Sequence, residues 1–584
     1  MRRTVIFFLI LVPTHMIAAQ TPADSALNKF FQDYLDADAK RHPVDASRLG
    51  DYRYADRMND LSPEARQDDV AFTKKILARL DKEIEYKTLT RASQIDYEIF
   101  RTSLVYSLWL AENMHTFEED PRAWNDYLVD SVFMLLAQST LEKATAIRYA
   151  AARMEAIPRV VANAKASLKK PLLPHLETAI KQNRGAIAFY ENGIYQMTGE
   201  TPQLSVLAQP AKAAVTALRE HQKFLESLRG EAHGQWRLGL DKFNKKLELE
   251  LDAGLTAAEV IRAAEEEKVR VVRDMYVIAR QLWCTSFPGV PLPPDDELGR
   301  RETIHKVLAL LGTHHSTPES VVADVRATVT DLKAFIKKRN ILPLPDPDKC
   351  DIIEMPEFQR GNSTAYLNPA PPLDPKAKSF YAVSPPPKDW DAHRIETYFA
   401  EYNHSMLKIL SIHEGYPGHY VQLEYANRHP SLIRRVQQSG VFAEGWAVYT
   451  EQMMLDEGYA KGDLPVRLHQ LKFYLRAVIN AILDHHMHCD NMTDEDALKL
   501  LMHDGFQSEA EAVGKIIRAK QSSVQLSTYF VGRTAFYRLR QRLSRELGAA
   551  FDLSTFHVAV LAHGTLPVKY LPELVATQLK PAKK

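Results

Sequence analysis

The sequence has little cysteine and no excess of charge of either sign. Its three cysteines, Cys284, Cys350 and Cys489, are too few for a disulfide scaffold and too far apart for a local cluster of thiolate metal ligands. Lysine and arginine together number 74, and so do aspartate and glutamate, so no overall positive field attracts nucleic acid or acidic lipid. These absences exclude a small disulfide-stabilised module and predict that the chain has no nucleic-acid partner.

Long hydrophobic runs are also missing, except for a short one near the N-terminus. Two arginines precede an apolar run from Val5 to Val12, and the small residues Ala18 and Ala19 follow it. This order is typical of a secretory signal peptide, and the run is far shorter than the roughly 20 residues of a membrane-spanning helix. We therefore predict a signal peptide over residues 1–20, cleaved near Ala19. The mature protein is expected to be exported, to the periplasm or the medium, without a stable membrane anchor.

The chain up to about residue 340 favours helices. With 45% hydrophobic and 25% charged residues, the composition is that of a globular protein, and apolar residues recur at helical spacing with little alternation of period two. We predict a helical N-terminal part over residues 21–340, with one long helix from Leu255 to Trp283. Capping patterns mark helix starts in this part and farther along the chain: Ser62 before Pro63, Thr256 with Glu259, Ser316 with Glu319, and Thr493 with Asp496.

Prolines concentrate over residues 341–390, where the composition of the sequence changes. Because proline removes a backbone donor and breaks helices, we predict loops and short strands here. Asp351–Met355 and Ser379–Val383 are the expected strands, in a small sheet beside a cleft. Helical spacing returns over residues 391–584, which we predict to be the catalytic part. The predicted fold is therefore mainly α, a large helical body with a small irregular and β segment near the active site.

The most informative stretch runs from Ser411 to Tyr420 and reads S-I-H-E-G-Y-P-G-H-Y. In zinc peptidases with an H-E-x-x-H motif, two histidines four residues apart on one helix face bind zinc, and the glutamate beside the first activates a water. Here His419 lies six residues after His413, so a regular helix would turn it about 120° away from the first histidine. Pro417 removes a helical hydrogen bond and Gly418 tolerates unusual dihedral angles. We therefore predict a local bulge that brings the second histidine back toward the first.

A zinc site of this kind needs a third protein ligand and an open position for water. Glu444 is the natural candidate, because it follows His419 in a stretch with apolar residues at helical spacing. Glu451 lies two helical turns farther on the same face, where a carboxylate could orient a ligating histidine. We predict one Zn²⁺ ion held by His413, His419 and Glu444. Glu414 is then expected to be the general base that takes a proton from a water at the metal.

Three stretches resemble the bacterial domain-of-unknown-function 885 family (DUF885): H-E-G-Y-P-G-H, E-G-W-A-x-Y-x-E and the run from Arg476 to His488. That family is regarded as similar to zinc metallopeptidases of the angiotensin-converting-enzyme and thermostable-carboxypeptidase kind. Those enzymes are largely helical and have a deep central groove, so the resemblance implies a metallopeptidase-like body with such a groove. It also implies metal-binding roles for His413, His419 and Glu444. By the same resemblance, Glu414 is the general base.

One stretch departs from the family's pattern. Where DUF885 members usually have Pro-Gly-Gln-Ala near the C-terminus, this chain has Ser523-Val524-Gln525-Leu526. A tyrosine and a glycine of the family nearby are kept, as Tyr529 and Gly532. The departure concerns residues expected to contact substrate and leaves the metal motifs intact.

Other polar residues are candidates for supporting roles. Asp484 and His488 lie four residues apart and would share a helix face. We predict that Asp484 supports the site from behind and that His488 donates a hydrogen bond to an oxyanion at zinc. Tyr381, Arg518 and Tyr529 carry groups that can hydrogen-bond a substrate, and the family resemblance favours the last two. We predict Tyr529 as a catalytic donor, with an ordinary structural role as the alternative for each of these residues.

The predicted function is that of an exported zinc-dependent hydrolase, a metallopeptidase that cleaves short peptides. Two alternatives stay open: a non-catalytic periplasmic binding or scaffold protein that keeps the fold, and a zinc amidase or esterase that acts on a non-peptide bond. The histidine spacing favours the first alternative, because a bulge that failed to return His419 would leave no working zinc site. No G-x-S-x-G or G-x-x-x-x-G-K motif occurs, so a serine hydrolase or a nucleotide enzyme has little support.

Overall fold

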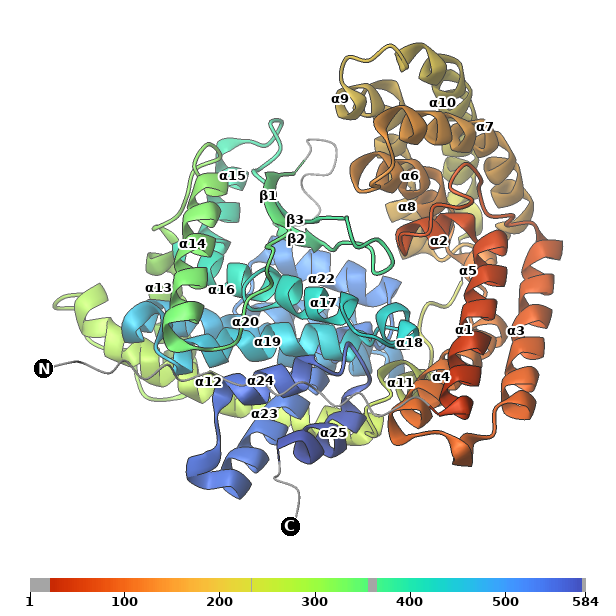
Figure 1. The fold of residues 1–584 in the computed structure, drawn as a ribbon. Helices are drawn as coiled ribbons and strands as arrows, with labels where there is room; N and C mark the ends of the chain where they lie inside the picture. The colour runs from red at the N-terminus through yellow and green to blue at the C-terminus, as the bar shows by residue number, and fades with distance from the viewer. Residues whose placement is uncertain (1–20, 233, 356–364, 580–584) are drawn as a thin grey trace, which may run out of the picture.

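The computed structural model describes residues 21–232, 234–355 and 365–579 (Figure 1). Almost all regular structure in these ranges is helical, and three short strands form one small sheet. This confirms the predicted mainly α fold with a small β segment. None of the described helices is both long enough and apolar enough to cross a membrane. The predicted signal peptide lies outside the described residues.

A group of helices at the upper right of Figure 1, here called the first lobe, has a hydrophobic core of its own. Its buried members lie between residues 44 and 61 and between residues 124 and 232. Trp124 and Met154 are fully buried in this core. The helices of the first lobe are α2 (Pro43–Arg48), α5 (Thr116–Glu119), α6 (Pro121–Ala137), α7 (Lys143–Ser167), α8 (Leu173–Ala188), α9 (Ile194–Thr198) and α10 (Leu204–Ser227).

A second, larger core belongs to the rest of the molecule, here called the main body. Its helices before the sheet are α1 (Pro22–Arg41), α3 (Pro63–Glu83), α4 (Arg91–Asn113), α11 (Leu240–Leu251), α12 (Ala257–Ser286), α13 (Glu297–Gly312) and α14 (Val321–Arg339). Its helices after the sheet are α15 (Ala392–Glu401), α16 (His404–Glu414), α17 (His419–Asn427), α18 (Leu432–Val436), α19 (Gly440–Asp456), α20 (Leu464–Cys489), α21 (Asp494–Lys499), α22 (Glu509–Gln521), α23 (Thr528–Leu547), α24 (Leu553–Leu561) and α25 (Leu571–Leu579). The division between the two cores therefore does not fall at residue 340, where the predicted N-terminal part ends.

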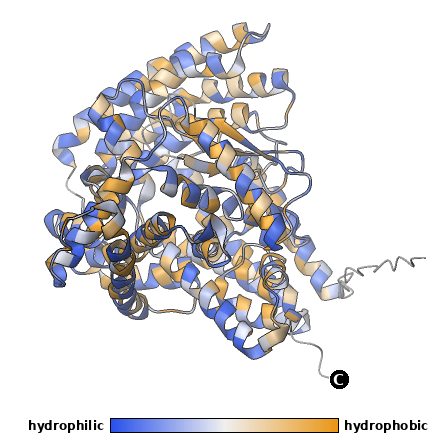
Figure 2. Cartoon of the chain, turned by 90° about the vertical axis from the view of Figure 1, so that its left-hand side faces the viewer, coloured by the Kyte–Doolittle hydropathy of each residue, from blue (hydrophilic) through white to orange (hydrophobic). Residues whose placement is uncertain are grey.

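Most helices carry both hydrophilic and hydrophobic residues (Figure 2), as expected for helices with one face in a core and one in solvent. The cap of α3 is Ser62, and capping boxes begin α12 at Thr256 and α21 at Thr493, as predicted. The predicted capping box at Ser316 is wrong, because α14 begins only at Val321. In a turn before that helix, the backbone amide of Thr317 donates a hydrogen bond to the hydroxyl of Ser320, and the backbone amide of Ser320 donates one to the hydroxyl of Thr317.

The sheet has the order β1-β3-β2 and lies in the proline-rich segment. β1 (Cys350–Glu354) pairs in parallel with β3 (Ser379–Val383), and β2 (Ala365–Asn368) pairs with β3 in the antiparallel sense. The two predicted strands correspond to β1, shifted by one residue, and to β3, while β2 was not predicted. No proline falls inside these strands, since proline cannot donate to the ladder. β2 lies against α16, the helix that carries the first histidine of the metal motif.

Candidate metal centre

The two motif histidines lie at the end of one helix and the start of the next, rather than on one bulged helix. α16 ends just after the first histidine and α17 begins at the second. Gly418 makes the sharp turn between them possible, because a Cβ atom there would lie 1.9 Å from the carbonyl oxygen of His413. The carbonyl oxygen of Pro417 accepts a hydrogen bond of 2.8 Å from the indole of Trp446. The predicted bulge is thus wrong in form, and a break between helices returns the second histidine instead.

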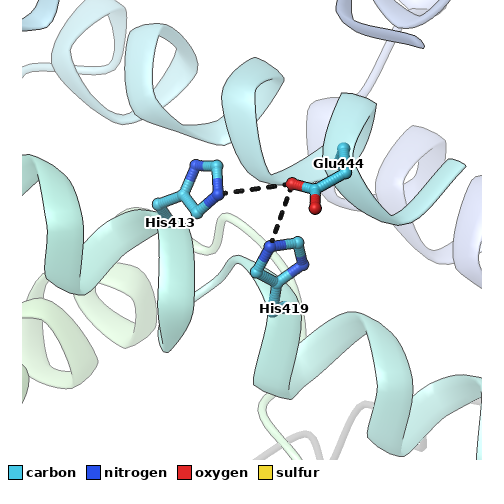
Figure 3. Close-up of side chains that lie close together, drawn as sticks. All are labelled: His413, His419 and Glu444. Atoms are coloured by element: carbon cyan, nitrogen blue, oxygen red, sulfur yellow. Dashed lines mark ion pairs between the residues drawn. The ribbon is translucent and has the colours of Figure 1, made fainter. Parts of the chain in front are cut away.

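His413, His419 and Glu444 converge on one point (Figure 3). Each offers one ligand atom, and the three atoms lie within 4.8 Å of one another. Glu444 Oε2 is 3.6 Å from His413 Nε2 and 3.4 Å from His419 Nε2. These separations exceed the length of a good hydrogen bond, and Glu444 Oε2 is buried without a hydrogen-bond partner among the described residues. Burial raises the pKa of the Glu444 carboxyl, but the two imidazoles lower it well below its ordinary value.

This arrangement fits a zinc ion. With zinc–ligand distances of about 2.0–2.2 Å and tetrahedral angles, two ligands of one ion lie about 3.4 Å apart, close to both measured separations. Histidine nitrogens and a carboxylate oxygen are a common ligand set of catalytic zinc, which keeps its fourth position for water. An ion here would also supply a partner for the unpaired oxygen of Glu444. Because His419 reaches the other two residues, the spacing argument for a non-catalytic binding protein no longer applies.

Glu451 lies behind the first histidine. Its Oε1 is 2.7 Å from His413 Nδ1 and the side chain is fully buried, so it holds the ring with Nε2 directed toward Glu444. Burial raises the pKa of the Glu451 carboxyl to about 7, against the lowering effect of His413. Burial lowers the pKa of His413, but Glu444 and Glu451 together raise it well above its ordinary value. A metal ion bound at this imidazole would compete with its protonation.

His413 and Glu414 form part of the wall of a cavity of about 580 Å³, which is within the size range of small-molecule sites. Glu414 Oε2 accepts a hydrogen bond of 3.0 Å from the backbone amide of Leu367 in β2, so its carboxylate is fixed at the wall. Five aromatic side chains also line this space: Trp390, Tyr398, Tyr402, Phe473 and Tyr529. The cavity thus combines the predicted general base with an apolar surface.

Arg518 and Tyr529 line the same cavity, as the prediction of substrate contacts requires. Arg518 Nη2 donates hydrogen bonds to the Tyr529 hydroxyl at 3.0 Å and to Gln525 Oε1 at 2.7 Å. Burial raises the pKa of the Tyr529 phenol, and Glu444 raises it further. The phenol is therefore protonated at neutral pH and can donate to a ligand.

Of the ten predicted site residues, only His413, Glu414, Arg518 and Tyr529 line the cavity. His419 and Glu444, which converge with His413, and Glu451, which is bonded to His413, do not line it, and neither do Tyr381, Asp484 and His488. Tyr381 is fully buried in β3, and its hydroxyl lies 3.3 Å from a serine hydroxyl of α16. Asp484 and His488 lie farther along α20 than the residues of that helix that do line the cavity. His488 Nε2 is 3.0 Å from the carbonyl oxygen of Ala519 and 2.9 Å from that of Ser522. The predicted placement of His488 as a catalytic donor is therefore wrong, because its Nε2 is bonded to these carbonyl oxygens away from the cavity, and its Nδ1 is buried without a partner among the described residues.

Asp484 holds the turn between α22 and α23. Its carboxylate accepts hydrogen bonds of 3.0 Å from the backbone amide of Val524 and from Ser527 Oγ. Val524 has a φ of 70°, in the left-handed region that favours glycine, and it stands where the DUF885 pattern usually has glycine. The departure from that pattern thus puts a β-branched residue into a backbone conformation that glycine adopts at lower cost. Arg518 and Tyr529 flank this turn, so Asp484 helps to set their position.

The cavity also contains charged residues that the sequence did not single out: Arg394, Glu401, Glu511 and Lys515. Lys515 lies three residues before Arg518 on α22, so the two share a helix face. This spacing is visible in the sequence, but a lysine on an amphipathic helix usually faces solvent. Only the packing of the surrounding helices turns this face toward the cavity.

Comparisons with known proteins agree with the motifs. Residues 43–575 match the family described as "Bacterial protein of unknown function (DUF885)". The chain belongs to the DUF885 family. The structure of a "putative lipoprotein of unknown function" from Shewanella oneidensis is 31% identical in sequence, covers 95% of this chain and 99% of its own, and has a TM-score of 0.78. A "putative lipoprotein" from Colwellia psychrerythraea shares the fold at 18% identity, with the same coverage of 95% and 99% and a TM-score of 0.75. No curated protein matches the chain.

Proposed function

We propose that this DUF885 protein is a zinc-dependent hydrolase that cleaves short peptides. The observation that carries the proposal is the convergence of His413, His419 and Glu444 directly beside Glu414. Two imidazoles and a carboxylate, with a second carboxylate next to them, are the parts that a metal-dependent site needs to activate water. The likeness of the motifs to those of zinc metallopeptidases supports the same reaction.

Several residues of the chain have separate roles in the proposed reaction. Zinc bound at this site would polarise a carbonyl group and lower the pKa of a water molecule toward 7. Glu414 takes the proton of the attacking water and passes it to the leaving amine. Its hydrogen bond from the Leu367 amide keeps the carboxylate in one orientation during both transfers. Glu451 keeps the ring of His413 in place.

Tyr529 provides a hydrogen-bond donor for the carbonyl oxygen of the substrate as negative charge develops on it. Its hydroxyl already accepts a hydrogen bond from Arg518, so its own hydrogen can be directed to the substrate. The positive charge of Arg518 strengthens this donation.

The cavity limits the size of the substrate. A space of about 580 Å³ accommodates a short peptide but not a folded protein chain. The aromatic side chains on its wall suit an apolar residue next to the bond that is cleaved.

We also propose that the protein is exported. The arginine pair, the apolar run and the small residues before position 20 follow the order of a signal peptide. The Shewanella oneidensis relative, similar over nearly its whole length, is described as a "putative lipoprotein", which agrees with an exported protein.

Hydrolysis of a panel of short peptides by the purified zinc-supplied protein tests the function, with Glu414→Gln as the variant. The variant should keep its zinc and its fold but lose about 10³-fold in kcat/KM, because general base catalysis contributes about 10²–10⁴-fold. Glu424→Gln is the control, since Glu424 pairs with Arg428 at 2.9 Å and does not line the cavity. Unchanged turnover in Glu414→Gln would remove Glu414 from the role of base. Cleavage of acyl amides or esters, but of no peptide, would replace the peptidase by an amidase or esterase.

A further inference from the structure

Several charged side chains around the cavity are paired within the protein, and the guanidinium of Arg394 lies over the Trp390 ring at 3.8 Å. Arg476 Nη2 lies 2.8 Å from Glu511 Oε2, and Lys472 Nζ lies 2.9 Å from Glu401 Oε2. Glu511 also accepts a hydrogen bond of 3.1 Å from the hydroxyl of Tyr402. The carboxylates of this part of the wall are therefore engaged by other groups.

Lys515 and Arg518 differ from these pairs. Both line the cavity, and neither forms an ion pair with a carboxylate in the part of the chain that the structure describes. Lys515 is only 5% exposed, and its ammonium group makes no hydrogen bond to any of the described residues. Arg518 donates only to two neutral groups, Gln525 Oε1 and the Tyr529 hydroxyl.

An unpaired ammonium group is costly to bury. Burial, together with the nearby charges of Arg476 and Arg518, lowers the pKa of Lys515 well below its ordinary value. An anion that enters the cavity would give both Lys515 and Arg518 a partner and would remove this cost. A carboxylate suits the pair, because its two oxygens can accept from an ammonium and from a guanidinium at the same time.

We infer that Lys515 and Arg518 bind a carboxylate group of the substrate, in the cavity whose wall includes His413 and Glu414. This inference rests on the proposed hydrolase function and narrows its substrates to peptides with a carboxylate close to the cleaved bond. The charge of Glu444 acts on both Lys515 and the Tyr529 phenol, and Arg518 donates a hydrogen bond to that phenol, so both cations lie near Glu444. The carboxylate can come from the C-terminus of the peptide or from an aspartate or glutamate side chain.

Binding of small probes tests the inference without relying on hydrolysis. Calorimetry would compare N-acetyl-phenylalanine with its carboxamide, and N-acetyl-glutamic acid α-amide with the corresponding glutamine compound. The full mature chain is used as purified and again after removal of metal by a chelator, so that carboxylate binding to zinc is recognised. At least one acid should bind about 10-fold or more tightly than its neutral partner, both to the protein as purified and to its metal-free form. This difference in affinity is the one expected of a charge-assisted hydrogen bond.

Variants assign that preference to the two cations. Lys515→Met and Arg518→Met should each reduce the ratio of acid to neutral binding to about 2-fold or less, with thermal unfolding as the check that they fold. Lys520→Met is the matched control on α22, because Lys520 pairs with Asp494 at 2.6 Å and does not line the cavity. A preference for the terminal acid identifies the peptide C-terminus as the source of the carboxylate, and a preference for the glutamic acid probe identifies an acidic side chain.

Two results would overturn the inference: equal binding of acids and neutral partners by the unmodified chain, or an unchanged ratio in both variants. Because binding is also measured in the metal-free form, in which metal-dependent cleavage of the probes' amide bonds does not occur, such a result leaves the hydrolysis test standing. If the hydrolysis test failed, the result of the binding test would still hold.

Discussion

Buried polar side chains serve different purposes in the first lobe and at the metal centre. In the first lobe, Arg153 is 1% exposed, and its guanidinium donates to the carbonyl oxygen of Ser131 at 2.5 Å and to Ser47 Oγ at 2.6 Å. These contacts tie α7 to α6 and α2. At the metal centre, Glu444 Oε2 is buried without a hydrogen-bond partner among the described residues. In the first arrangement two guanidinium nitrogens join helices, while Arg153 Nε has no partner among the described residues. In the second, the unpaired oxygen faces two imidazole nitrogens, an arrangement that fits a ligand.

A single unpaired buried group does not make a site. His221 of the first lobe is fully buried, and neither ring nitrogen has a hydrogen-bond partner in the described part of the chain. Burial lowers its pKa to about 4, so the ring is neutral at physiological pH and no charge is buried. Glu444 differs because two imidazole nitrogens face one of its oxygens. Convergence of several such groups, rather than burial alone, distinguishes the metal centre.

The largest effect on stability is expected from Arg153, which joins three helices of the first lobe. Arg153→Ala should lower the free energy of unfolding by about 3 kcal/mol, because it leaves a cavity and two acceptors without donors. Zinc content and the activity of the folded fraction should not change. Chemical denaturation checks the first result and elemental analysis the second. Arg148→Ala, at an exposed position on the same helix, is the control. A loss of zinc in Arg153→Ala would contradict the claim that the first lobe does not contribute to metal binding.

A smaller effect is expected at Glu451, which supports the centre without touching the metal. Glu451→Gln should weaken zinc binding by about 10–100-fold, as changes behind a ligating histidine usually do. Competition with a chelator measures the affinity. Asp456→Asn on the same helix removes a carboxylate that pairs with Arg467 at the surface and should leave the affinity unchanged. Equal affinities of Glu451→Gln and the unmodified chain would show that the ring of His413 is held by other means.

The smallest effect is expected at Ser527, whose hydroxyl bonds to Asp484. Burial raises the pKa of Asp484 to about 7, against the lowering effect of Val524 and Ser527. In the folded state this carboxyl is therefore protonated below pH 7 and ionised above it, and the serine hydrogen bond favours the ionised form. Ser527→Ala should cost about 1 kcal/mol of unfolding free energy at about pH 8 and less at about pH 5.5.

Denaturation curves at the two pH values check this result. Thr303→Ala is the control, because the buried hydroxyl of Thr303 bonds to the neutral carbonyl oxygen of Gly299, and its loss should cost the same at both pH values. An equal loss in Ser527→Ala at both values would mean that Asp484 does not titrate in this range.

Part of the arrangement of His413, His419 and Glu444 could be predicted from sequence, because some relations among the candidate ligands and their neighbours are local. His413 and Glu414 are adjacent, and Glu444 and Glu451 are separated by two turns of one helix, so helical periodicity alone sets much of their geometry. The prediction that the turn before His419 brings this histidine back toward His413 was correct, but the turn is a break between two helices rather than a bulge. A proline and a glycine can produce either a bulge or a helix end, and contacts with other helices decide between them.

The surroundings of the centre were predicted less well, because they depend on how helices pack. Asp484 and His488 share a face of α20, as predicted, but that face meets the turn between α22 and α23 instead of the cavity. Lys515 carries no sequence signal that separates it from a surface lysine. Spacing tells which residues share a face, and only tertiary packing tells what that face meets.

The most direct test of the account is the metal content of the purified mature protein, measured by elemental mass spectrometry beside an identically prepared Glu444→Ala variant. The account predicts close to one zinc ion per chain in the unmodified protein and a large loss in the variant, with the fold kept in both. Absence of bound metal in the unmodified protein after zinc is supplied and the excess removed would contradict it. Full retention of zinc by Glu444→Ala would contradict the assigned ligands.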